Sequence, residues 1–288
     1  MAPAVTTATM LLMASERGGG ESYRERRAAP SLRGWLSCVW VQQVSSGSAP
    51  YEHRSVPNGG VELRCRVGSV PRVAGPQTRA TVELLAPGAV VVGVRFRPGA
   101  APPALGVPAS ELLDLEVGAD ELWGRPATAL GERLAASASP EEAATMLEQE
   151  VLSRLAGATA PDPLVGEVVR RLHPWRKGDV ASLTSSLHVS ERQLRRRCHD
   201  AVGLAPKTLQ RMLRFQGFLA LAQEADADLA RLAADAGYAD QAHLTRESRR
   251  LSGRSPAALL REGEEHCRRT HDHAASYAPL RAGALTRG

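Results

Sequence analysis

Apolar and polar residues alternate along the chain between residues 35 and 96, as they do in β-strands. From Val61 to Val67 apolar residues alternate with charged ones, which predicts a strand with one buried and one charged face. The stretch 90–96 repeats this alternation between two Pro-Gly breakers. Residues 58–60, Asn-Gly-Gly, are typical of a tight turn, and residues 38–41 are a candidate hairpin partner for the strand after the turn. These segments predict an antiparallel sheet.

Beyond residue 98 the apolar positions take the period of an α-helix. Helices are expected over 127–136 and 140–156, and the second begins with Ser139-Pro140-Glu141-Glu142. A serine can cap a helix, a proline fits its first turn, and acidic residues favour the positive end of the helix dipole. Residues 157–162 read as a linker that begins Gly-Ala-Thr-Ala-Pro. We therefore expect an α+β domain over residues 22–156.

An internal repeat follows, in which residues 50 positions apart match one another. The matching pairs are Ser190 with Asp240, Leu194 with Leu244, Arg196 with Arg246, Gly203 with Gly253 and Pro206 with Pro256. Each copy reads as a short helix, a tight turn, a capped helix and a glycine that ends it. The repeat predicts two helix-turn-helix units in an all-α domain at residues 163–262.

In the first unit we expect a short helix over 180–187 and a second helix capped by Ser190, with Gln193 completing a capping box. Basic residues spaced i, i+3, i+4 and i+7 form one face of that second helix, namely Arg192, Arg195, Arg196 and His199. Leu194, Cys198 and Ala201 point the other way, toward a core. Arg197 lies between the two faces, where it either covers the core or reaches a phosphate.

In the second unit a supporting helix over 229–236 stops at Gly237, and Asp240 caps the next helix. The outer face and exposed first turn of that helix carry Gln241, Ala242, His243, Thr245, Arg246 and Arg249. An arginine can bind guanine through a two-pronged fork and a glutamine can bind adenine, so such a face suits base edges and phosphates. Both units thus offer a candidate DNA-reading helix.

A helical segment over 206–223 connects the two units. At about 1.5 Å per residue, such a helix spans about 27 Å, close to the roughly 34 Å between successive major grooves on one face of a duplex. The spacing predicts that one chain reads two adjacent grooves.

Charge supports a polyanionic partner. The chain has 288 residues with 36 Lys and Arg against 31 Asp and Glu, and residues 161–262 hold 17 of the basic and 12 of the acidic ones. No apolar run is long enough for a membrane span, and no basic residue precedes the short apolar stretch 10–14. The four cysteines form no Cys-x-x-Cys pair, so we expect reduced thiols in a cytoplasmic protein, and we expect no cofactor.

These residues resemble the DNA-binding domain of AraC/XylS transcription regulators. The resemblance rests on Ser190-x-x-x-Leu194-x-Arg196, Gly203-x-x-Pro206, Gly237-Tyr238-x-Asp240-Gln241-x-x-Leu244-x-Arg246 and Gly253-x-Ser255-Pro256. It implies that base or backbone contacts fall on Arg192, Arg195, Arg196, Gln241, Ala242, His243, Thr245 and Arg246. The chain departs from the family at Cys198 and Ser248, where a Phe is usual, which predicts looser packing of both helices. The resemblance implies double-stranded DNA as the partner and a nucleoid-associated location in the cytoplasm of a bacterium. It leaves open whether the protein contacts RNA polymerase and whether it activates or represses transcription.

The preceding segment resembles the sensor or dimerisation domain of actinobacterial members of the family. The similarity lies in His53-Arg54-x-Val56-Pro57-x-Gly59, Ala74-Gly75-Pro76 and Gly93 to Ala100, although Asn58 stands where Asp is expected. It implies a domain that forms a homodimer or receives a small-molecule effector. Candidate pocket residues are Trp40, His53, Asn58, Glu62 and Arg95.

Other interpretations carry less weight. A run of arginines is usually a solvated helix face, but the duplication argues for DNA. A zinc site could be formed by His266, Cys267, His271 and His273. These residues lie in 263–288, which together with residues 1–21 we expect to be flexible tails.

No hydrolase, phosphate-binding or zinc-protease motif occurs, so no catalysis is expected. The alternative function is DNA alkylation repair with Cys38 or Cys65 as acceptor, although neither has a His or Cys at ligand spacing.

Overall fold

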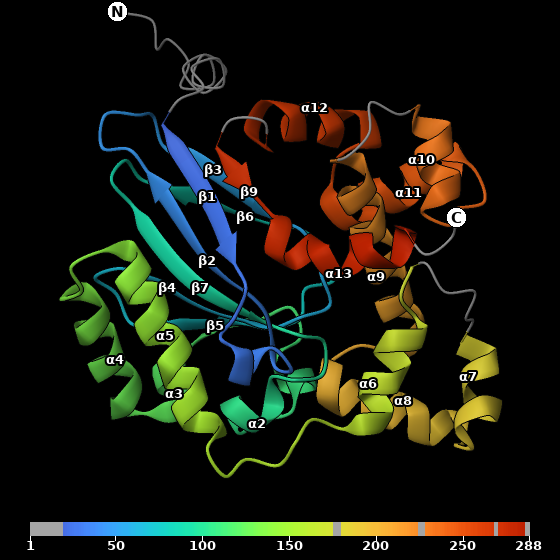
Figure 1. The fold of residues 1–288 in the computed structure, drawn as a ribbon, viewed down its shortest axis with the longest axis horizontal. Coiled ribbons are helices and arrows are strands. Elements are labelled where there is room, and N and C mark those ends of the chain that lie inside the picture. Colours follow the sequence, from blue (N-terminus) through green and yellow to red (C-terminus); the bar gives the residue numbers. More distant parts are fainter. Residues whose placement is uncertain (1–19, 175–179, 224–227, 268–269, 286–288) are drawn as a thin grey trace, which may run out of the picture.

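A computed structural model describes residues 20–174, 180–223, 228–267 and 270–285, in which a sheet domain lies beside a helical domain (Figure 1). The larger sheet has the strand order β8-β5-β4-β7-β2-β1-β9, and β3 pairs with β6 in a separate ribbon. The strands are β1 (Glu21–Arg26), β2 (Leu36–Val44), β3 (Tyr51–Ser55), β4 (Glu62–Arg66), β5 (Arg72–Ala74), β6 (Thr81–Leu85), β7 (Val90–Phe96), β8 (Glu116–Gly118) and β9 (His271–Asp272). The α+β class expected for this domain is confirmed.

The predicted hairpin between residues 38–41 and the strand at 61–67 is wrong. β4 pairs with β5 and β7, whereas β2 pairs with β1 and β7. Gly68, with a φ of +92°, provides the tight turn that joins β4 to β5, so β4 finds its hairpin partner downstream. The sheet is also mixed and not purely antiparallel, because β9 runs parallel to β1.

Helices cover one face of the sheet (Figure 1). They are α2 (Pro102–Leu105), α3 (Ala119–Trp123), α4 (Arg125–Ala135) and α5 (Pro140–Leu155), with short 3-10 turns η2 (Pro30–Leu32) and η3 (Ala109–Leu112). Leu63, Val94 and Phe96 of the sheet share a fully buried core with Leu130 and Leu147 of the helices. The predicted start of α5 is confirmed, since the Ser139 side chain accepts a hydrogen bond from the amide of Glu142 at 3.1 Å.

The helical domain contains both predicted helix-turn-helix units. Its helices are α6 (Pro163–Arg171), α7 (Val180–Leu187), α8 (Glu191–Val202), α9 (Pro206–Ala222), α10 (Leu229–Asp235), α11 (Gln241–Ser252) and α12 (Pro256–Cys267). Leu194 and Leu244, the matching core positions of the repeat, are fully buried together with Phe215 and Phe218 of α9. The connecting helix is therefore the centre of this domain's core.

The described part of the C-terminal segment is not the free tail that we expected. β9 pairs with β1, and α13 (Ala274–Leu285) lies between the sheet and α9 (Figure 1). Tyr277 and Leu280 pack on Ala220, and the amide of Ser276 donates to the Glu25 carboxylate at 2.8 Å. These contacts join segments about 250 residues apart, which no local pattern signals. Of the expected N-terminal tail, residues 1–19 lie outside the described residues.

Candidate nucleic-acid interface

The first candidate reading helix, α8, begins and ends as its sequence predicts. Ser190 accepts a hydrogen bond from the amide of Gln193 at 3.2 Å, and the Gln193 side chain accepts one from the amide of Ser190 at 3.1 Å. Gly203 ends the helix in the left-handed conformation, with a φ of +78°. This reciprocal cap stabilises the N-terminal end of α8, where the first predicted contact residue, Arg192, lies.

The outer face of α8 is free to meet a partner. Arg192, Arg195, Arg196 and His199 are all exposed, while Leu194 and Cys198 are fully buried behind them. Within the described residues, no carboxylate forms an ion pair with any of the three arginines. Their guanidinium groups therefore remain available to phosphates or base edges.

Arg197 forms an ion pair that the sequence did not predict. Its guanidinium forms a two-pronged ion pair with Asp162, with 2.6 Å between Nε and Oδ2. The same carboxylate caps α6 by accepting the amide of Leu164 at 2.9 Å. Burial raises the pKa of Asp162, but hydrogen bonds from Arg197 and from the backbone outweigh this and lower it overall. Arg197 thus ties the interdomain linker to the reading helix.

The second reading helix, α11, is capped by Asp240, which accepts the amide of His243 at 2.6 Å. Four of the predicted contact residues are exposed, namely Gln241, Ala242, Arg246 and Arg249. The other two are half-buried: the Thr245 hydroxyl donates to the carbonyl of Gln241 at 2.9 Å, and the His243 ring meets Tyr238 edge-on at 5.2 Å.

Polar contacts hold α11 onto the connecting helix. Glu247 forms a two-pronged ion pair with Arg211 of α9 at 2.7 and 2.8 Å, so the two charges neutralise each other. Ser248, at the position where the family has Phe, is fully buried and donates to the carbonyl of Arg254 at 2.9 Å. A local hydrogen bond thus takes the place of an aromatic ring.

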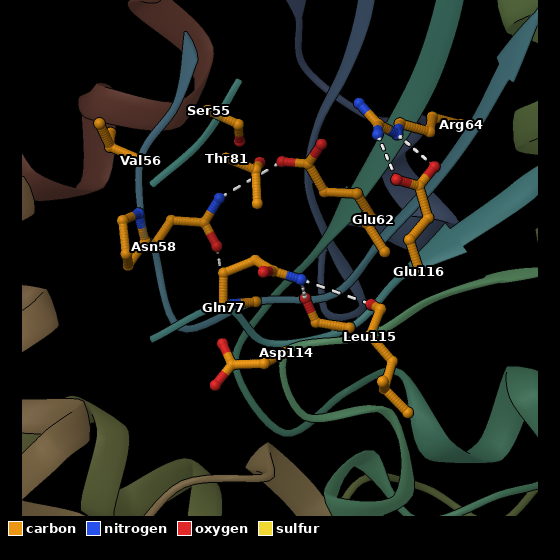
Figure 2. Close-up of a pocket in the computed structure, with 14 residues that line it drawn as sticks. Ser55, Val56, Asn58, Glu62, Arg64, Gln77, Thr81, Asp114, Leu115 and Glu116 are labelled. Carbon is orange, nitrogen blue, oxygen red and sulfur yellow. Dashed lines mark hydrogen bonds and ion pairs between the residues drawn. The ribbon is translucent and has the colours of Figure 1, made fainter. Parts of the chain in front are cut away.

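A polar cavity of about 100 Å³ opens in the sheet domain (Figure 2). Its walls include the predicted residues Asn58 and Glu62, whereas Trp40, His53 and Arg95 lie outside its lining. Sequence reasoning missed the remaining polar side chains of the lining, because they come from separated segments: Ser55, Arg64, Gln77, Thr81, Asp114 and Glu116.

The polar groups around this cavity are fixed by hydrogen bonds and ion pairs. The Asn58 amide donates to Glu62 at 3.3 Å, and Arg64 pairs with Glu116 at 2.6 Å (Figure 2). Glu62 also accepts from Nε of Arg95 at 2.6 Å. Burial raises the pKa of Glu62, yet the Arg95 guanidinium outweighs this and lowers it, so the carboxylate stays charged.

The buried cysteines do not suit acceptor chemistry. Burial raises the pKa of Cys65 and that of Cys198 to about 11, and it raises the pKa of Cys38 further still. A nucleophilic cysteine needs the opposite shift, toward thiolate. Among the described residues, no cluster of His, Cys, Asp or Glu has metal-binding geometry, and no helix is long and apolar enough to cross a membrane.

Comparison with known proteins agrees with the two-part architecture. Residues 183–262 match a family described as a helix-turn-helix domain, and residues 24–118 match a domain of unknown function (DUF6597). A search of curated proteins finds no match. Two solved structures of ToxT from Vibrio cholerae also match the chain. The apo form of a ToxT variant has a TM-score of 0.42 at 10% identity over 83% of this chain and 96% of its own. The 1.65 Å structure has a TM-score of 0.44 at 9% identity over 83% and 98%.

The paired, capped helices with exposed basic faces define a helix-turn-helix DNA-binding protein. The helix-turn-helix domain at residues 183–262 is of the AraC type.

Proposed function

We propose that the chain recognises a specific DNA sequence by placing α8 and α11 in two successive major grooves of one duplex. The observation that carries this proposal is the equivalence of the two helices, which are capped at matching positions and expose basic residues at Arg196 and Arg246. α9 joins them and is 17 residues long, which corresponds to about 25 Å. Two helices held at its ends suit neighbouring grooves.

Within this proposal the side chains divide into two groups. Arg195, Arg196, Gln241 and Arg246 read base edges, because they combine exposure with hydrogen-bonding groups that match guanine and adenine. Phosphates are bound by Arg192, His199 and Arg249, and Ala242, His243 and Thr245 complete the groove-facing surface. Phosphate contacts give affinity and salt dependence, and base contacts give sequence choice.

Selection of bound fragments from a random duplex library, followed by binding at several salt concentrations, tests the proposal. We expect two short blocks about 10 base pairs apart and tight binding relative to scrambled duplex. Enrichment of one block alone would overturn two-groove reading. Binding to all sequences alike, lost as salt rises, would overturn sequence-specific recognition.

A second proposal concerns the sheet domain, which we infer receives a small effector in its polar cavity. Among the carboxylates that line the cavity, Glu62 is paired with Arg95 and Glu116 with Arg64. Within the described residues Asp114 has no ion pair, and its free negative charge favours a small amine or polyol over an acid. Ethanolamine should raise the unfolding temperature and shift DNA affinity, and acetate should do neither. Unchanged DNA affinity with a panel of small amines and polyols would leave homodimer formation as the simpler role.

A further inference from the structure

We infer that the sheet domain fixes the distance between the two reading helices and thereby selects the spacing between the two DNA blocks. The inference rests on the proposed two-groove reading. It starts from contacts between three segments of the sheet domain, residues 54–57, 76–80 and 109–112, and three points on the helical domain. These contacts are called the brace below.

The first point of the brace is the C-terminal end of α8. There Gly203 lies against the sheet domain so closely that a Cβ would be 2.8 Å from the carbonyl oxygen of Ala109 and 2.9 Å from Cγ of Pro76. Along the same helix end, α8 packs against η3. A glycine is therefore required at position 203 for two reasons: the left-handed φ and this close approach of the sheet domain.

The second point is the C-terminal end of α11. The amide of Ala80 donates to the carbonyl of Leu251 at 2.7 Å, and the Arg54 guanidinium donates to the carbonyl of Ser252 at 3.4 Å. The last carbonyls of a helix lack partners within it and carry the negative end of its dipole. The sheet domain therefore supplies both a donor and a cation to this helix end.

These two points are equivalent in the repeat, since Gly203 matches Gly253, which directly follows Ser252. Both lie at the C-terminal helix ends, beyond the last residues proposed to read bases, Arg196 in α8 and Arg246 in α11. The third point is the connecting helix, where the buried side chain of Gln216 donates to the carbonyl of Pro57 at 2.8 Å. The brace thus holds both reading helices from behind without covering the faces that would meet DNA.

The loops of the brace are joined to each other within the sheet domain. Asp114 accepts the amide of Thr78 at 2.6 Å and its hydroxyl at 2.7 Å, and the amide of Asp114 donates to the carbonyl of Pro76 at 2.9 Å. One loop reaches α11 through Ala80 and the other follows η3, which packs on α8. The path from one helix to the other thus runs through hydrogen bonds at α11 and within the sheet domain, and through packing at α8.

The test uses the full chain and the duplex selected above, in versions whose blocks are moved apart or together by one and two base pairs. One base pair shifts a block by about 3.4 Å and rotates it around the duplex, so a rigid brace penalises the change. We expect wild type to prefer its own spacing, and the double variant Arg54→Ala/Asp114→Ala to lose at least about fivefold of that preference.

Arg79→Ala removes an exposed positive charge beside Ala80 without removing a brace contact, so it serves as the matched control and should keep the wild-type spacing profile. Circular dichroism verifies that each variant is folded, and Arg54→Ala alone replaces the double variant if that fails to fold. A folded brace variant with an unchanged spacing profile would overturn the inference. Absence of any two-block site for wild type would instead overturn two-groove reading itself.

Discussion

Asp114 and Thr78 form a doubly hydrogen-bonded pair that joins two loops of the sheet domain, each of which leads to a different reading helix. Asp114 adopts a φ of +56°, in the left-handed region that few residues other than glycine occupy. The two hydrogen bonds that Thr78 donates to the Asp114 carboxylate hold the residue in this backbone conformation. The same residue also lines the polar cavity, so a ligand bound there would touch the link between the two helices.

Replacing Arg196 tests base reading by α8. Arg196→Ala should cost about 1–3 kcal/mol on the preferred site and relax selectivity at one base pair, because a two-pronged contact to guanine is lost. Binding to the selected site and to single-base variants measures this. Arg231→Ala, an exposed arginine on α10, is the control with the same loss of charge. Equal weakening on all sequences would assign Arg196 to phosphate binding.

The ion pair between Asp162 and Arg197 should stabilise the linker against α8. Asp162→Asn keeps an oxygen that can cap α6 but removes the charge, and we expect a loss of about 0.5–1 kcal/mol because the pair is partly exposed. The folded-state pKa of Asp162 is lowered, so this contribution is complete above the ordinary pKa of 3.8 and is lost as the pH falls through the folded value. Urea unfolding of both proteins at pH 7 measures the difference, and equal stability there would contradict the prediction.

Docking of α13 should depend on Glu25. Its carboxylate accepts the amide of Ser276 at 2.8 Å and pairs with Arg95 at 3.1 Å. Although burial raises its pKa, bonds to His273 and Arg95 outweigh this and bring it to about 2, below the ordinary 4.5. The stabilisation is therefore complete above pH 4.5 and is lost as the pH falls toward about 2.

Glu25→Gln should reduce protection of the α13 amides by about 1–3 kcal/mol, because buried donors lose a charged acceptor. Hydrogen exchange resolved by peptide measures this. Glu132→Gln, an exposed carboxylate on α4, should leave α13 protection unchanged. Equal protection in both variants would show that apolar packing alone holds α13.

The buried thiols should be inert in the folded protein. Cys38 and Cys65 are 0% and 1% exposed, and their raised pKa values leave little thiolate at neutral pH. An alkylating reagent should label them only after unfolding, as peptide mapping would reveal. Rapid labelling of either cysteine in the native protein would revive the acceptor-thiol alternative.

The helix-turn-helix units were predictable because their signals are local. Caps such as Ser190 and Asp240 and the stop at Gly203 lie within one or two turns of the helices that they bound. The partner of Arg197 lies 35 residues away, and the brace joins residues up to 198 positions apart. Contacts of this range depend on how the domains pack. Periodicity alone therefore predicts neither the strand that pairs with β4 nor the residues that line the cavity.

The return of the chain to the sheet through β9 has a consequence for the order in which the molecule is built. The helical domain is in effect an insertion, with one crossing into it at the linker and a second crossing back before β9. A nascent chain leaves the ribosome from its N-terminus, so the sheet gains its outermost strand only after every DNA-reading helix has been synthesised. Until then the outer edge of β1 lacks this strand.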